Sequence, residues 1–326
     1  MKVTGVSFSS DKKLVHCQQQ YSYRYDEKLQ KRIKSKGLFM GSVLHTLIET
    51  YRRKGDWEKR LRIWEKKEWK PLFDEEKEGY EEKGMTPKIV HDLMEHYVEH
   101  WGAEDLLWKP LFIEQAFEIP TKYGFPIRFK ADYIAQKGKV IALFENKNKG
   151  DIPEGEERML APQPHSYAYL LTKLPQPIHV TRIVWDYIRT EKVPSPKILK
   201  NGDLSKREIK TDQRTYLKAL KEAGIHPKGG EELIGLENFL KTLPETLTLT
   251  RVTNSVNLRV GEMFVRDWVA RALQARDIKR PTRNWGRDCK WFCDYRTLCM
   301  ADMLGTPDRN TIIKKDFVTH IKKAGD

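Results

Sequence analysis

The chain has 326 residues, enough to bury a substantial core, and it carries a net charge of +14 because Lys and Arg outnumber Asp and Glu. A balance this basic points to a polyanionic partner, most commonly nucleic acid. No apolar run approaches the length needed to cross a bilayer, and the start, MKVTGVSFSSDKK, lacks the apolar centre of a signal peptide. We therefore expect a cytoplasmic protein without a membrane partner.

The first third of the chain is expected to be mostly helical. Residues 21–36 are aromatic and basic, and residues 38–51 carry apolar side chains at helical spacing. Residues 52–110 are charged and rich in tryptophan, and they predict a helical insertion beside a sheet. His45 lies on the helix over 38–51, and a lone helical histidine usually packs or faces solvent, so spacing alone gives it no role.

The stretch over 125–148, FPIRFKADYIAQKGKVIALFENKN, predicts a β-hairpin. Both halves are rich in aromatic and β-branched residues, and the chain must reverse between them. With Gly138 and Lys139 at the centre of a type II′ turn, the numbers of opposed residues sum to 277. Asp132 then faces Glu145, with their Cβ atoms about 4.5 to 5.5 Å apart.

Lys147 emerges on the same face as Glu145, because side chains alternate along a strand. Two carboxylates this close repel unless a proton or a cation lies between them, and Mg²⁺ or Mn²⁺ prefers oxygen ligands. A neighbouring lysine can activate the attacking water and offset charge that develops on phosphorus. Solvated hairpins also show this pattern, so by itself it leaves a catalytic and a structural interpretation open.

The elements around the hairpin predict a mixed α/β sheet packed on helices. Residues 111–119 and 177–190 have the composition of strands, and the apolar periodicity of 156–174 indicates a crossover helix. Further along we expect a polar helical lid, an amphipathic helix and a basic tail, over 204–230, 256–278 and 305–326.

Two further features join the hairpin. Gln163 and Tyr167 lie four apart in QPHSY and so share a face of the crossover helix. The helix over 38–51 contains GSVLH, from Gly41 to His45. With one early and three late cysteines, the chain resembles the RecB-type PD-(D/E)xK nucleases of the iron–sulfur branch, which includes CRISPR-associated four-cysteine exonucleases, AddB-type nuclease subunits and phage exonucleases.

The resemblance implies a role for each matched residue. Asp132 corresponds to the motif II aspartate, and Glu145 and Lys147 correspond to motif III. Lys147 is expected to activate the water, while Gln163 and Tyr167 position the DNA backbone or pack the helix. The implied Mg²⁺ or Mn²⁺ ligands are His45, Asp132, Glu145 and the backbone carbonyl of Asn146.

The cysteines imply a second metal centre. Cys17, Cys289, Cys293 and Cys299 match the four-thiolate arrangement of a [4Fe–4S] cluster in the family, although the late three read C-x3-C-x5-C where many relatives have C-x2-C-x5-C. Structural zinc accepts the same four ligands and stays open as an alternative, with two disulfides more remote.

The implied architecture is a single restriction-endonuclease-like nuclease domain over 1–304, with the insertion over 52–110 and chain ends clamped by a cluster at Cys17 and 286–300. The implied activity is metal-dependent DNA exonuclease cleavage in recombination, repair or phage DNA processing, with DNA ends or single strands as substrate and a recombination or helicase protein as partner. A catalytically silent DNA-end-binding module and a DNA endonuclease are the alternatives.

Overall fold

The fold is organised around a five-stranded sheet in the order β2-β3-β4-β5-β6. The computed structural model of the chain describes residues 1–32, 35–82, 85–148, 155–190, 193–199, 204–205, 210–226, 231–284, 286, 289 and 293–319. All neighbouring strands run antiparallel except β4 and β5, which are parallel, so the predicted mixed sheet is confirmed. The strands are β2 (Lys109–Ile119), β3 (Ile127–Lys137), β4 (Val140–Asn148), β5 (Arg182–Ile188) and β6 (Leu249–Ser255).

The β3–β4 hairpin has the predicted register. Tyr133 pairs with Phe144, and Lys137 pairs with Val140, so opposed numbers sum to 277. Gly138 opens the turn with a φ of 57°, which suits the first central position of a type II′ turn. The tight turn therefore fixes which side chains meet at the far end of the hairpin.

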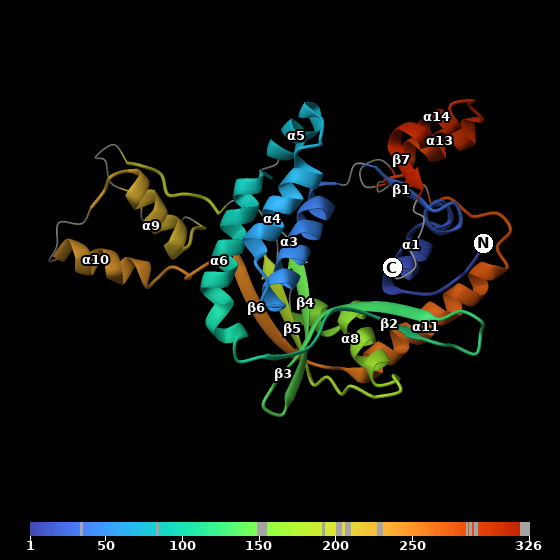
Figure 1. Cartoon of the computed structure of the whole chain (residues 1–326), viewed down its shortest axis with the longest axis horizontal. Helices are drawn as coiled ribbons and strands as arrows, with labels where there is room; N and C mark the ends of the chain where they lie inside the picture. The colour runs from blue at the N-terminus through green and yellow to red at the C-terminus, as the bar shows by residue number, and fades with distance from the viewer. Residues whose placement is uncertain are drawn as a thin grey trace.

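Helices cover both faces of the sheet (Figure 1). On one face, α3 and its neighbours bury a core that includes Leu44, Ile48 and Met94. On the other face, α8 and α11 pack on β3 and β4 through residues such as Leu171, Trp268 and Leu143. The first group comprises α3 (Lys36–Arg52), α4 (Trp57–Trp64), η2 (Glu65–Trp69), α5 (Asp74–Glu81) and α6 (Pro87–Asp105); the second comprises α8 (Pro162–Leu171) and α11 (Leu258–Arg276).

The crossover from β4 to β5 is broken where one helix was predicted over 156–174. A short α7 (Gly155–Met159) precedes α8, and a proline occupies the first position of α8. Proline lacks the amide hydrogen that a continuous helix needs, so it starts a new helix instead. The break leaves α8 free to lie along α11, where Gly261 approaches the backbone of His165.

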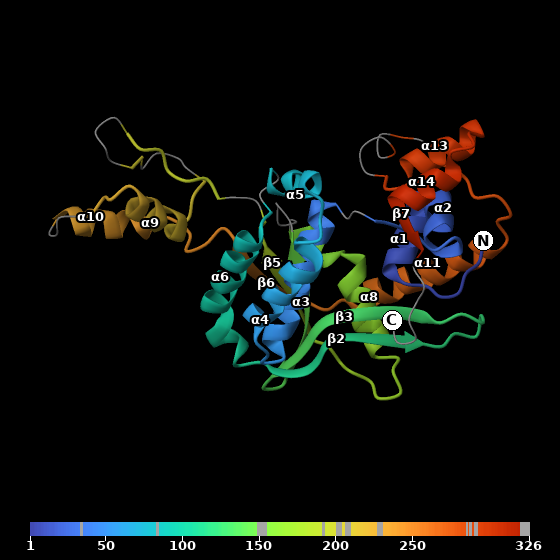
Figure 2. The same ribbon diagram turned by 45° about the horizontal axis from the view of Figure 1, so that its top comes forward.

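Residues from both ends of the chain form a separate terminal lobe, defined here as 8–31 and 293–319 (Figures 1 and 2). Its core holds Tyr23, Leu29, Tyr295, Leu298 and Phe317. The lobe comprises α1 (Phe8–His16), α2 (Gln18–Tyr21), η1 (Ser22–Asp26), β1 (Leu29–Lys31), α13 (Arg296–Leu304), α14 (Arg309–Asp316) and β7 (Phe317–Thr319).

Two expectations for this lobe differ from the structure. Residues 309–319 form α14 and β7 instead of a tail, because β7 pairs antiparallel with β1 and buries Phe317. The basic segment over 21–36 is helical only to Asp26 and then supplies β1. Residues 320–326 lie outside the described part of the chain.

A projecting arm of two helices, α9 (Gln213–Glu222) and α10 (Glu231–Leu240), precedes β6 (Figures 1 and 2). It occupies part of the region predicted as a polar helical lid over 204–230. The described ranges include no helix long and apolar enough to span a membrane.

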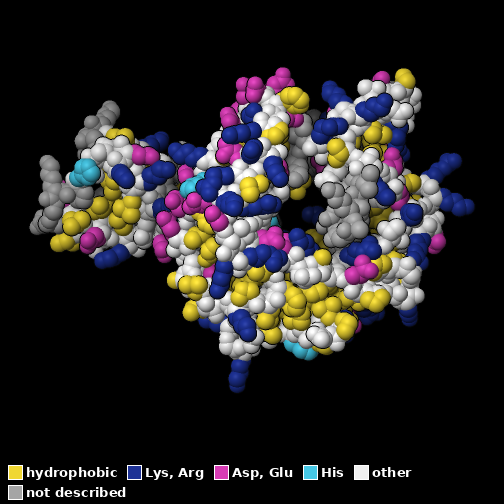
Figure 3. Space-filling model, viewed as in Figure 1, with side chains coloured by type: hydrophobic (Ala, Val, Ile, Leu, Met, Phe, Trp, Pro, Cys, Tyr) yellow, Lys and Arg dark blue, Asp and Glu magenta, His cyan; other side chains and the backbone are white. Residues whose placement is uncertain are grey.

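The surface is hollowed between the helices α3 to α5 and the terminal lobe, on the side of these helices away from the arm (Figure 3). Lys and Arg side chains lie on both walls of this hollow.

The contact between α8 and α11 should be intolerant of a single methyl group. A Cβ built on Gly261 would lie 2.1 Å from the carbonyl oxygen of His165, so Gly261→Ala must push the two helices apart. We expect a loss of about 1–3 kcal/mol in the free energy of unfolding, measured by urea denaturation. The control is Gly235→Ala in α10, where nothing lies within 4 Å of the added methyl. Equal stability of the two variants would contradict this packing.

Candidate active site

Two carboxylates from neighbouring strands form the centre of the site. Asp132 on β3 and Glu145 on β4 are the residues next to the pair of Tyr133 and Phe144, at the end of the hairpin far from the turn. The backbone amide of Asn146 donates to Oδ2 of Asp132 at 2.9 Å, and Glu145 is only 1% exposed. Within the described chain, Oε2 of Glu145 is buried without a hydrogen-bond partner. A buried, unpartnered carboxylate oxygen of this kind is a position where a cation would be stabilised.

Burial and the neighbouring Glu145 raise the pKa of Asp132 to about 7, although His45 acts in the opposite direction. Two charges in one poorly solvated place make the ionised pair unfavourable. Near neutral pH the metal-free site therefore holds a proton that a divalent cation would replace.

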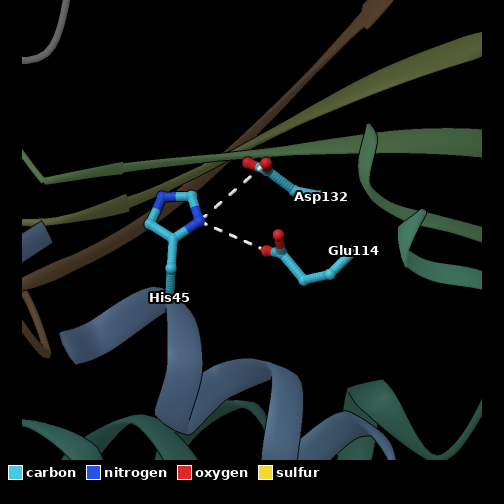
Figure 4. A group of neighbouring side chains, drawn as sticks. All are labelled: His45, Glu114 and Asp132. Atoms are coloured by element: carbon cyan, nitrogen blue, oxygen red, sulfur yellow. Dashed lines mark hydrogen bonds and ion pairs between the residues drawn. The ribbon is translucent and has the colours of Figure 1, made fainter. Parts of the chain in front are cut away.

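His45 projects from α3 toward a pair of acids on the sheet (Figure 4). Its Nδ1 lies 3.3 Å from Oε1 of Glu114 and 3.8 Å from Oδ1 of Asp132. Burial lowers the pKa of His45, but the hydrogen bond to Glu114 and the negative charges of the site outweigh it and raise that pKa overall. When protonated, the ring can act as a counterion of these acids.

Glu114 is the member of the site that the sequence analysis did not find. It lies in β2 with a φ of 49°, in the left-handed region that a non-glycine residue rarely adopts. Its neighbours Ile113 and Gln115 pair with Tyr133 and Ala131, which puts Glu114 level with Asp132. Lys130 also contacts its Oε2 at 2.7 Å. An acid within an apolar strand was the available signal, but the connection between β2 and β3 is too long for a two-residue turn rule to give the register.

Lys147 and α8 close the other side of the site. The ammonium group of Lys147 donates to Oε1 of Glu145 at 2.5 Å and to Oε1 of Gln163 at 3.2 Å. Burial lowers the pKa of Lys147, but the charge and hydrogen bond of Glu145 raise it overall, so the group is cationic. Gln163 also hydrogen-bonds to Tyr167, whose pKa is raised by burial and by Glu145. Tyr167 itself is nearly buried against Phe129.

The structure thus brings together every residue that the sequence analysis assigned to this site. The donor set fits a hard divalent cation: potential ligand atoms of His45, Glu114 and Asp132 lie within 4.8 Å of one another, and Glu145 offers its unpartnered oxygen. Asn146 is held beside them through its amide.

The four cysteines also come together, although they lie at opposite ends of the sequence. Cys17, Cys289, Cys293 and Cys299 line one small cavity of about 20 Å³, and none of them forms a disulfide. Gln20 donates to the sulfur of Cys293 at 3.0 Å, and Arg283 donates to that of Cys299 at 3.3 Å. Such donors stabilise thiolates, so the donor set fits a thiolate-ligated metal. Of the predicted cluster region over 286–300, residues 287–288 and 290–292 lie outside the described chain.

A mixed sheet with two buried carboxylates and a lysine on adjacent strands is an arrangement suited to metal-dependent hydrolysis of phosphodiesters. The family model of the PD-(D/E)XK nuclease superfamily matches residues 5–300, and the chain belongs to this superfamily. It is therefore of the class that hydrolyses phosphodiester bonds. No curated protein matches the sequence.

Among solved structures, the chain is similar to a candidate exonuclease from Eubacterium rectale. The identity is 10% and the TM-score 0.48, with 93% of this chain and 94% of that chain covered. A likeness this distant does not bear on the substrate.

The raised pKa of Asp132 predicts that metal binding strengthens with pH. Below about pH 7 the cation must displace the proton, so the apparent affinity for Mn²⁺ should fall by about tenfold for each pH unit. Isothermal titration calorimetry at pH 6, 7 and 8 measures this. Equal affinity at pH 6 and 8 would show that no such proton is displaced.

The same proton affects folding of the metal-free protein. The folded pKa of about 7 exceeds the ordinary value of 3.8, so the folded state binds more protons between these values and is destabilised as pH rises through that window. Asp132→Asn removes the repulsion and serves as the control. It should melt at a higher temperature than the parent protein at pH 8 in EDTA.

Proposed function

We propose that the protein is a divalent-metal-dependent DNA exonuclease of the RecB type. The observation that carries the proposal is the buried pair of Asp132 and Glu145, with Lys147 bonded to one acid and His45 facing the other. A bound cation would give Oε2 of Glu145 the partner that this buried oxygen lacks in the described structure. A metal-dependent nuclease needs carboxylate oxygens that are free to bind a cation, whereas a structural ion pair would satisfy them.

Each side chain has a place in this proposal. His45, Asp132 and Glu145 would hold Mg²⁺ or Mn²⁺ with the backbone carbonyl of Asn146, and Glu114 is placed to add a further oxygen. The ion supplies Lewis acidity toward the phosphate and lowers the pKa of water. The ammonium group of Lys147, oriented by Gln163, lies where it can orient the attacking water and offset negative charge that develops on the phosphoryl oxygens.

DNA as the substrate is supported by charge. The net charge is +14, and Lys and Arg side chains lie on both walls of the hollow beside the terminal lobe (Figure 3). Phosphate contacts of this kind bind nucleic acid with little dependence on sequence. Action on ends or single strands, in recombination, repair or phage DNA processing with a helicase or recombination partner, follows from the resemblance to RecB-type proteins.

The terminal lobe, in this proposal, is held by a [4Fe–4S] cluster on Cys17, Cys289, Cys293 and Cys299. The support is that four thiols from the two ends of the chain line one cavity. A centre shared by Cys17 and Cys299 closes a loop of nearly the whole chain, which restricts the unfolded ensemble. Zinc on the same thiols is the alternative.

Lysine and carboxylate variants should behave differently. Asp132→Ala or Glu145→Ala should abolish both Mn²⁺ binding and cleavage. Lys147→Ala should keep Mn²⁺ binding and lose about 100-fold or more in cleavage rate, because it removes a charge that acts in the transition state but leaves the carboxylates. Calorimetry and single-turnover cleavage measure the two effects.

The substrate is tested with circular and end-labelled linear DNA in Mg²⁺ or Mn²⁺. Release of mononucleotides from linear DNA alone supports an exonuclease, whereas cut circles indicate an endonuclease. Binding without products indicates a silent end-binding module. Lys221→Ala, on the exposed surface of α9 in the projecting arm, is a control expected to cleave at the rate of the parent. An Asp132→Ala protein that still cuts would refute the assignment of the site.

The cluster has its own test. Anaerobically purified protein should be brown, absorb near about 400 nm and contain about four irons per chain. Cys17→Ser should lose the iron and much of the soluble protein, whereas His16→Ala, next to it, should keep both. Stoichiometric zinc without iron would show that the alternative is correct.

A further inference from the structure

Arg52 is a buried cation close to the candidate site. It contacts Asn146 and the strand residues next to Asp132 and Glu145, not the two carboxylates themselves. It lies on α3, seven residues after His45, and its side chain is 3% exposed. The guanidinium group packs over the rings of Tyr133 and Phe144, at 4.3 and 5.3 Å from their centroids. These two residues are the cross-strand pair next to Asp132 and Glu145.

The hydrogen bonds of Arg52 fix its orientation. NH2 donates to Oδ2 of Asp186 at 2.9 Å and to the hydroxyl of Tyr97 at 3.0 Å. NH1 donates to Oδ1 of Asn146 at 3.2 Å. The planar guanidinium thus joins β4, β5 and α6 at one point, which a lysine ammonium cannot do with the same geometry.

Asn146 carries this contact into the site. Its side chain accepts from Arg52, while its backbone amide donates to Oδ2 of Asp132. Asn146 is thus held through its side chain by Arg52 and through its backbone amide by Asp132. Arg52 therefore restrains the residue whose backbone amide holds Asp132.

We propose that Arg52 is a positioning residue that acts through the side chain of Asn146 to hold the Glu145–Asn146 peptide and Asp132 in the geometry that binds the divalent cation. This inference rests on the proposed function, and it adds a residue that no motif of the sequence identifies. Partners that orient metal ligands in this way typically change metal affinity by about 10- to 100-fold when they are lost.

Arg251 on β6 provides a matched control. It is equally buried, and it bonds to the same Tyr97 and Asp186, at 2.8 and 3.0 Å. Within the described residues, however, no hydrogen bond joins Arg251 to Asn146. Substitution of either arginine disturbs the shared ion pair with Asp186, and substitution of Arg251 also disturbs its ion pair with Asp105. Among the described hydrogen bonds, only that of Arg52 reaches Asn146.

The experiment compares Arg52→Lys, Arg251→Lys, Asn146→Ala and the double variant of Arg52→Lys with Asn146→Ala. Melting temperature, the dissociation constant for Mn²⁺, and kcat and KM for linear DNA are measured for each. We expect Arg52→Lys and Asn146→Ala to weaken Mn²⁺ binding by about tenfold and to lower kcat at subsaturating Mn²⁺, with KM for DNA unchanged. Arg251→Lys should lower the melting temperature by a similar amount but bind Mn²⁺ with the affinity of the parent.

The double variant decides whether the two residues act as one unit. Mn²⁺ binding no weaker than in the single variants supports the proposal, because each substitution already breaks the same contact. Multiplied losses, or equal Mn²⁺ affinities of Arg52→Lys and Arg251→Lys, would overturn it. If Arg52→Lys does not fold, Asn146→Ala carries the test, and parent-like Mn²⁺ affinity there overturns the proposal. A parent protein that binds no Mn²⁺ would instead refute the proposed function itself, and this inference with it.

Discussion

The main constraint on this structure is that two carboxylates lie close together where solvent screens their charges poorly. Asp132 and Glu145 meet because one glycine-led turn fixes the register of β3 and β4. Burial, together with repulsion by Glu145, raises the pKa of Asp132 to about 7, so the folded chain contains a centre that is unfavourable when fully ionised. His45, Lys147 and the amide of Asn146 reduce this penalty, and Oε2 of Glu145 remains buried without a hydrogen-bond partner in the described chain.

Helix α3 serves the hairpin from two sides. His45 and Arg52 are seven residues apart, which is two helical turns or about 10.5 Å. The first reaches the carboxylates, and the second packs behind them on Tyr133 and Phe144. One helix therefore presents His45, a proposed metal ligand, and supports the strands that carry Asp132 and Glu145. Leu44 and Ile48, on the same helix, anchor it in the core.

The sequence predicted the parts of the site that local rules determine. A two-residue turn sets the β3–β4 register, and helical spacing brings Gln163 and Tyr167 to one face, so these relations followed from residue numbers alone. Glu114 did not follow, because the β2–β3 register is set by a connection longer than a two-residue turn and by tertiary packing. The contact of Arg52 with Asn146 is tertiary and has no local signature.

The fold shows the same division between local and tertiary information. The strand β6, LTRVTNS, was not predicted, because its polar side chains resemble a loop until β5 pairs with it. The same holds for β7, since three residues form a strand only when the other end of the chain supplies β1. Elements whose stability comes from a distant partner are the ones that propensity misses.

Charge at two scales suggests an order of events. The basic walls of the hollow attract a polyanion from a distance, whereas the candidate site holds the carboxylates of Glu114, Asp132 and Glu145, which repel a phosphate. Without a cation, a polyanion would be attracted to the walls and repelled from these carboxylates. Attraction by the surface and admission by the pocket are therefore separate properties, and only the second requires the carboxylates to be neutralised. Under the proposed function, the protein would hold DNA through its basic surface and would depend on the divalent ion for each cleavage.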